Sequence, residues 1–122
     1  MRNVPAAVPT IKLYANKAVT AEQLTNVLLG VEEENVPIEV IRDDELNPLE
    51  LAHKAAVASS LGIGIGASLD YLAVTTEKLP AGRPYMVTWL GESWMNDRHA
   101  GANAARLVKR TPLLRLTSER SA

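Results

Sequence analysis

The sequence of 122 residues contains no cysteine, which excludes disulfide bonds, a thiol nucleophile and cysteine-ligated metal centres. It also has no phenylalanine, and its two tryptophans and three tyrosines leave few side chains for stacking on nucleic-acid bases. The net charge of −1 gives no basic excess for a phosphate backbone. No stretch approaches the roughly 20 apolar residues that cross a bilayer, and no apolar run at the start suggests a signal peptide. We therefore expect a cytoplasmic protein that binds neither nucleic acid nor membrane.

Hydrophobic residues make up 47% of the chain and charged residues 22%, which is typical of a globular protein. The length suits one hydrophobic core rather than two. We expect a flexible leader at residues 1–9, a single domain at residues 10–116 and a flexible tail at residues 117–122.

Sequence signals mark both the start and the end of the first helix. Thr20 followed by Gln23 is the pattern of a capping box, and an apolar stripe runs from Leu24 to Val31. Pro37 ends this helix and begins a strand. The sequence therefore predicts a strand, a helix and a second strand within the first 41 residues.

Two further helices follow. Asn47 before Pro48 predicts a helix that runs to about residue 60, and either Ser93 or Asn96 caps a last helix that ends near Arg110. Strands are expected at residues 9–16, 37–41, 61–66, 71–76 and 84–90. The order β-α-β-α-β-β-β-α predicts a three-layer α/β fold, Rossmann-like or anticodon-binding-like, with a mainly parallel sheet of about five strands and three helices.

A glycine run at residues 62–67, GIGIGA, contains the formal dinucleotide-binding pattern GxGxxA. That pattern binds a pyrophosphate when a strand precedes it and a helix follows it. Here a helix precedes and a strand follows, so we favour a strand whose glycines admit a closely packed neighbour. A free-standing nucleotide-binding domain remains the weaker alternative.

An acidic triplet, Glu32, Glu33 and Glu34, lies in the last turn of the first helix, where the helix dipole disfavours negative charge. One interpretation is a solvated helix end. The other is that a cation or a basic partner compensates the charge, with one carboxylate completing a metal site whose other ligands lie on another chain.

The last helix combines small residues, at Gly101 and Ala104, with basic residues, at Arg98, Arg106 and Lys109. It is either an amphipathic surface helix or a helix that docks a subunit or an anion. The two histidines lack the spacing of a metal site, and no catalytic motif is present. We therefore expect a non-catalytic chain.

Two segments resemble the small subunit of diol and glycerol dehydratase-reactivating factors. Residues 27–37, VLLGVEEENVP, are similar to the family pattern LLG-(I/V)-EEE-x-(I/V)-P. Residues 98–109, RHAGANAARLVK, resemble the pattern R-x-x-G-x-N-A-A-R-L-V-K. The resemblance extends over roughly residues 10–116. At the start of the last helix the chain departs from the family, with Asp97 for a histidine and with His99 and Ala100 for an Asn-Thr pair.

The resemblance implies a chaperone-like role. In this family the small subunit pairs with a large ATPase subunit that binds ATP or ADP, in a heterotetramer of two of each. The complex releases damaged cobalamin from a coenzyme B12-dependent dehydratase, and the small subunit leaves transiently in a subunit exchange. The isolated small subunit can form a homodimer, and the system can be associated with a bacterial microcompartment.

The resemblance also implies site residues. Glu33 is expected to reach the large subunit and to help hold a Mg²⁺ ion, and in the isolated chain the acidic helix end would be uncompensated. The expected subunit interface includes Glu32, Glu34, Arg98, Asn103, Arg106 and Lys109. The nearest alternative is the medium subunit of the dehydratase itself, which shares this fold.

Overall fold

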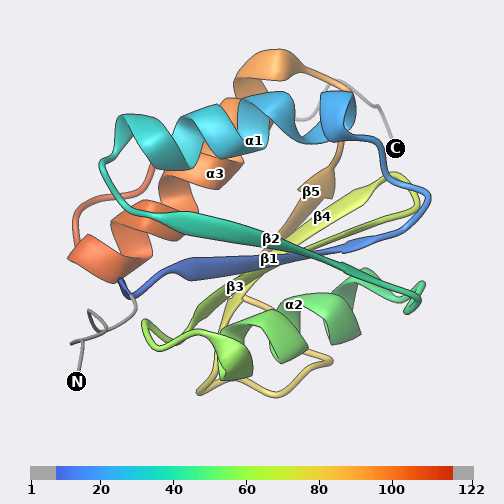
Figure 1. Cartoon of the computed structure of the whole chain (residues 1–122). Coiled ribbons are helices and arrows are strands. Elements are labelled where there is room, and N and C mark those ends of the chain that lie inside the picture. Colours follow the sequence, from blue (N-terminus) through green and yellow to red (C-terminus); the bar gives the residue numbers. More distant parts are fainter. Residues whose placement is uncertain (1–7, 117–122) are drawn as a thin grey trace, which may run out of the picture.

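Within residues 8–116, which a computed structural model describes, five strands and three helices follow one another in the predicted order (Figure 1). The predicted tail and all of the predicted leader except residues 8 and 9 lie outside this range. No helix within it is long and apolar enough to cross a membrane. The elements are β1 (Ile11–Asn16), α1 (Ala21–Glu33), β2 (Ile38–Asp43), α2 (Pro48–Ala58), β3 (Ile63–Ser68), β4 (Tyr71–Thr76), β5 (Met86–Trp89) and α3 (Trp94–Lys109).

The sheet has the strand order β2-β1-β3-β4-β5 and is mixed. β2, β1 and β3 are parallel, whereas β3, β4 and β5 are antiparallel. The prediction of a mainly parallel sheet therefore holds for only half of the strand pairs. A parallel pair needs a long crossover, which α1 and α2 provide. The two-residue turn after β3 and the helix-free loop after β4 instead reverse the chain.

The helices cover the sheet unequally. α1 and α3 lie together on one face, and α2 lies alone on the other (Figure 1). The main core fills the space below α1 and α3, where Leu13, Ile65 and Leu72 of the sheet meet Val27 and Val31 of α1. The α2 side is built mainly from small residues.

The predicted helix caps are confirmed. Thr20 and Gln23 form the capping box of α1, with both reciprocal hydrogen bonds present. The Asn47 side chain accepts a hydrogen bond of 2.9 Å from the backbone of Leu49 at the start of α2. For α3 the sequence left two candidates open, and Ser93 is the cap.

The glycine run is a packing surface for α2. A Cβ atom at Gly64 or Gly66 would overlap the backbone of α2, at Ala52 in both cases. β4, not a helix, follows the run. The geometry is therefore that of a strand under a closely packed helix, and it lacks the helix N-terminus that a dinucleotide site requires.

This contact predicts a strong effect of one methyl group. Gly64→Ala should lower the free energy of unfolding by about 1–3 kcal/mol, because the rigid α2 backbone must move to admit the methyl. Gly82→Ala is the matched control, since a Cβ there meets no atom within 4 Å. Urea unfolding of both variants measures the difference. Equal midpoints would show that α2 does not rest on the β3 backbone.

Candidate functional site

The candidate site depends on the close contact between α1 and α3. A Cβ atom on Gly30 of α1 would overlap the carbonyl oxygen of Arg98, and one on Gly101 of α3 would overlap that of Val27. The two helices therefore touch through their backbones. This proximity brings the basic side chains of α3 to the acidic end of α1, although more than 60 residues separate them in the sequence.

Glu34 lies at the centre of a charge cluster. Arg106 Nε donates to Glu34 Oε2 at 3.0 Å, and Lys109 Nζ donates to Oε1 at 2.6 Å. Lys109 Nζ also donates to the Glu34 carbonyl oxygen at 3.0 Å, so it caps the C-terminal end of α1. The Glu34 side chain is 16% exposed. The hydrogen bond from Lys109 lowers the pKa of Glu34 most, burial opposes this shift, and Arg106 lowers the pKa further.

Glu33 is more open. Arg98 Nη1 donates to Glu33 Oε2 at 3.0 Å, while the Glu33 side chain remains 57% exposed. Arg98 is itself held, because its Nη2 donates to Asn26 Oδ1 at 2.8 Å and its guanidinium lies 5.6 Å from the centre of the Trp94 ring. Oε1 of Glu33 has no hydrogen bond with a residue in the described part of the chain.

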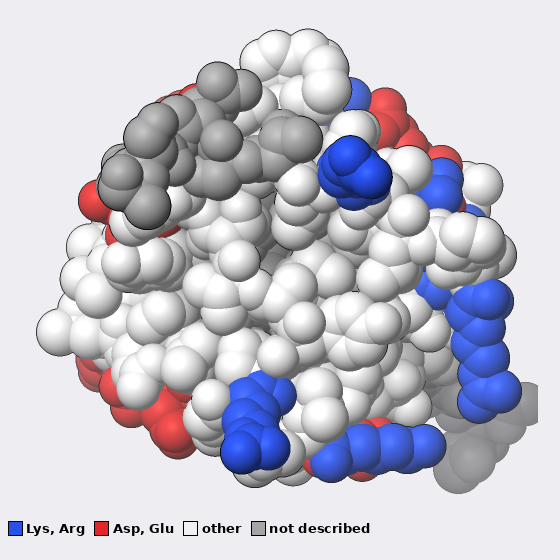
Figure 2. Space-filling model, turned by 180° about the vertical axis from the view of Figure 1, so that it is seen from behind, with Lys and Arg blue, Asp and Glu red and all other residues white. Residues whose placement is uncertain are grey.

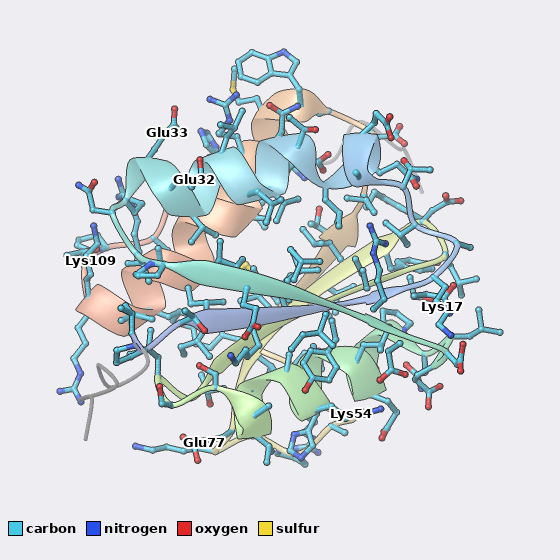
Figure 3. The ribbon with its side chains drawn as sticks, in the orientation of Figure 1. Lys17, Glu32, Glu33, Lys54, Glu77 and Lys109 are labelled. Carbon is cyan, nitrogen blue, oxygen red and sulfur yellow. The ribbon has the colours of Figure 1, made fainter. Side chains whose placement is uncertain are left out.

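Glu32 is exposed and forms no ion pair with another residue between positions 8 and 116. Figure 3 shows Glu32 and Glu33 on the outer side of α1, with Lys109 at the neighbouring end of α3. The acidic end is therefore largely compensated within the chain, contrary to the expectation of an uncompensated helix end. The reason is the close approach of α3, which the sequence does not reveal.

The metal-binding capacity of the cluster is limited. Among the described residues, no group of three or more His, Asp or Glu side chains could hold a metal ion. A carboxylate oxygen is a suitable ligand for Mg²⁺, and Glu33 offers one at the surface. Glu33 therefore fits as a single ligand of a site that another molecule would complete.

Asn103 does not lie at this surface. Its side chain is buried, with Nδ2 donating to the Leu114 carbonyl at 2.9 Å and Oδ1 accepting from the Leu114 backbone at 2.6 Å. The predicted interface residue instead fastens the segment after α3, which Arg106 Nη1 also contacts through the Pro112 carbonyl at 2.9 Å. The asparagine amide, which has both a donor and an acceptor, matches the backbone N–H and C=O of this one residue.

Two contributors were missed by the sequence interpretation. Asn26 and Trp94 both position Arg98, yet neither belongs to the recognised motifs. Asn26 lies seven residues before Glu33, which places both on one side of α1 two turns apart. That spacing was the available signal. Nothing in the sequence pointed to Trp94.

Asp97, where the chain departs from the family pattern, has a structural role. Its carboxylate is buried and accepts hydrogen bonds of 3.2 and 3.1 Å from the backbone N–H of Gly91. Burial raises the pKa of Asp97, and the hydrogen bonds from Gly91 oppose this shift. Gly91 has a φ of +82°, so the carboxylate fixes a tight turn at the entrance to α3.

The sequence model of the dehydratase medium-subunit family matches residues 8–114. The chain belongs to this family. It is 35% identical over 108 residues to the propanediol dehydratase-reactivating factor small subunit of Citrobacter freundii, covering 85% of this chain and 89% of that protein. It is 37% identical over 93 residues to the diol dehydratase-reactivating factor small subunit of Klebsiella michiganensis, covering 76% and 74%.

Solved structures agree with these relatives. A chain of a diol dehydratase-reactivating factor complexed with ADP and Mg²⁺ superposes with a TM-score of 0.83 at 30% identity, over 89% of this chain and 100% of that one. A chain of a glycerol dehydratase reactivase gives a TM-score of 0.81 at 33% identity, over 88% and 97%. The resemblance to reactivating-factor small subunits inferred from the two motifs is therefore confirmed.

The Glu34 cluster predicts a pH-dependent stability. Because the pKa of Glu34 is lowered by folding, its contribution is present above the ordinary value of 4.5 and is lost as the pH falls through the folded-state pKa. Glu34→Gln should lower the free energy of unfolding by about 1 kcal/mol at pH 7, and the difference should vanish in acid. Urea unfolding from pH 3 to 7 measures it, with Glu32→Gln as a neutral control. A difference independent of pH would contradict this.

Proposed function

We propose that this chain is the non-catalytic small subunit of a factor that reactivates a coenzyme B12-dependent diol or glycerol dehydratase. The observation that carries the proposal is the agreement with reactivating-factor chains over nearly the whole chain, in both sequence and structure. In the proposed complex, two small subunits pair with two large ATPase subunits that bind ATP or ADP. The complex releases damaged cobalamin, and the small subunit leaves transiently during a subunit exchange with the dehydratase.

The exposed end of α1 is the proposed contact with the large subunit. Glu33 would provide one ligand of a Mg²⁺ ion there, and the partner would supply the others. When bound, the ion would neutralise carboxylates from both chains at one point. The proposal is supported by the free Oε1 of Glu33 and by the related structure, which holds ADP and Mg²⁺. Glu32 lies beside Glu33 at the same surface, and Glu34, Arg106 and Lys109 support it.

Arg98 is suited to make this contact reversible. It holds Oε2 of Glu33 while Asn26 and Trp94 fix its guanidinium, so the isolated chain already has a cation beside the carboxylate. A divalent ion binding at Oε1 would therefore replace only part of the compensation that Arg98 provides. Solvent-exposed ion pairs contribute little net free energy. A contact built this way suits a subunit that must both bind and leave.

The medium subunit of the dehydratase is the nearest competing function, since the matching family model carries that description. The curated relatives and both solved structures are reactivating-factor proteins, which favours the reactivating factor. Affinity purification of the tagged chain from its native cells distinguishes the two. We expect a large ATPase subunit in the eluate. Recovery of two other dehydratase subunits in fixed stoichiometry, without the ATPase, would contradict the proposal.

Glu33→Gln tests the role of the carboxylate. With the large subunit and Mg²⁺ present, we expect the variant to bind about tenfold more weakly than the natural chain, because the neutral amide is a poor ligand for a hard cation. Isothermal titration calorimetry with and without a chelator measures this. The chelator should reduce the binding of the natural chain and leave the variant unchanged.

Glu32→Gln is the matched control, because it removes the same charge from the neighbouring position and should leave the Mg²⁺ dependence intact. Unchanged affinity and metal content in Glu33→Gln would overturn the assignment of Glu33. Protection of the isolated chain against thermal unfolding by ATP or ADP would instead support the alternative of a nucleotide-binding domain.

A further inference from the structure

The first turn of α3 exposes two large apolar side chains. Trp94 is 59% exposed and Met95 is 50% exposed, and neither belongs to the main core. Trp94 directly follows the cap residue Ser93, whose hydrogen bond starts the helix without help from an indole ring. Large apolar side chains that remain in water next to a candidate site are typical of a surface that another molecule covers.

Leu29 of α1 extends this apolar surface. Helical spacing places Asn26, Leu29 and Glu33 in one stripe along α1. Asn26 and Glu33 both bind Arg98 of α3. Leu29 lies between them on the stripe and is exposed, at the outer edge of the contact between the two helices. We call Leu29, Trp94 and Met95 the Trp94 patch.

Arg98 joins the Trp94 patch to Glu33. Its guanidinium lies 5.6 Å from the centre of the Trp94 ring and donates to Glu33 Oε2 at 3.0 Å. Nε of Arg98 is buried and has no hydrogen-bond partner among residues 8–116. The guanidinium is thus fixed and partly dehydrated in the free chain, so covering it orders few additional groups. A cation–π contact also becomes stronger when water is removed from it. Trp94 and Glu33 therefore belong to one continuous, preorganised surface.

The charge around the Trp94 patch selects among partners. Glu22, Glu32 and Glu33 are exposed on α1, which contains no lysine or arginine. A second copy would bring the same carboxylates to the contact, and an anionic membrane surface would repel them. In Figure 2 the top of the molecule, where α3 begins in Figure 1, shows uncharged side chains next to basic and acidic ones. The surface therefore suits a protein with an apolar pocket beside a metal ion or basic groups.

We propose that the Trp94 patch is the apolar centre of the contact with the large ATPase subunit, with Trp94 inserted in a pocket of that partner beside the Mg²⁺ site. The inference rests on the proposed function and adds to it a contact that does not depend on the metal. Tryptophan and arginine are enriched among the residues that dominate binding free energy at interfaces. Glu33 then determines the metal dependence of the complex, whereas Trp94 supplies affinity that remains without the metal.

Titration calorimetry of the chain with the large subunit tests this inference, first in Mg²⁺ and then with a chelator. Trp94→Ala should bind about thirtyfold more weakly in both conditions, because the indole contact is lost with or without the ion. Tyr85→Ala is the matched control. Tyr85 is an aromatic side chain that is 50% exposed just before β5 and outside the patch, so its removal should leave the affinity unchanged.

Nuclear magnetic resonance separates a direct contact of Trp94 from an effect through Arg98. The chain has two tryptophans, and 5-fluorotryptophan incorporated into this chain alone gives one ¹⁹F signal for each. Trp89→Phe assigns the signals and keeps a ring beside Tyr71, on which Trp89 stacks. Adding the unlabelled large subunit should shift the Trp94 signal and shield it from solvent, while the Trp89 signal stays unchanged.

Natural affinity in Trp94→Ala, or a Trp94 signal that the large subunit does not change, would overturn the inference and leave the proposed function intact. A loss of affinity in Trp94→Ala that disappears with the chelator would also overturn it, because Trp94 would then act only by holding Arg98 against Glu33. A natural chain that does not bind the large subunit at all would contradict the proposed function itself, and this inference with it.

Discussion

The backbone contact between α1 and α3 determines where the charged side chains of this protein can act. Gly30 and Gly101 remove the side chains that would hold the helices apart. The helix axes come close enough for Arg98, Arg106 and Lys109 to reach the acidic end of α1. A larger residue at either glycine would displace the partner helix, and the charge cluster would open with it. The charge cluster therefore depends on the absence of side chains at Gly30 and Gly101.

Glycines also permit a close backbone contact on the other face of the sheet, but there the contact joins a helix to a strand. Gly64 and Gly66 let α2 settle on β3, next to a layer of alanines that includes Ala52. Among the described helices, α2 alone lies on this face, and Val87 of β5 remains 47% exposed there. The apolar surface over β4 and β5 follows from that placement, because the chain continues from β4 to β5 without a second helix on this side.

These two consequences give the two faces of the sheet different surfaces. The α1–α3 side presents charge, with one carboxylate oxygen of Glu33 available to a partner. The α2 side presents an uncharged surface near the β3–β4 turn.

Local signals determined much of this protein. The capping box at Thr20, Asn47 before Pro48 and the glycine strand fixed the element order, because caps and periodicity act within a few residues. The acidic triplet marked the candidate site, because three adjacent glutamates at a helix end can be recognised in a short stretch of sequence. The burial of Asn103, the compensation of Glu33 by Arg98 and the half-antiparallel sheet were decided by tertiary structure. Each depends on groups that are distant in sequence and meet only when the helices and strands pack, so no local pattern could specify them.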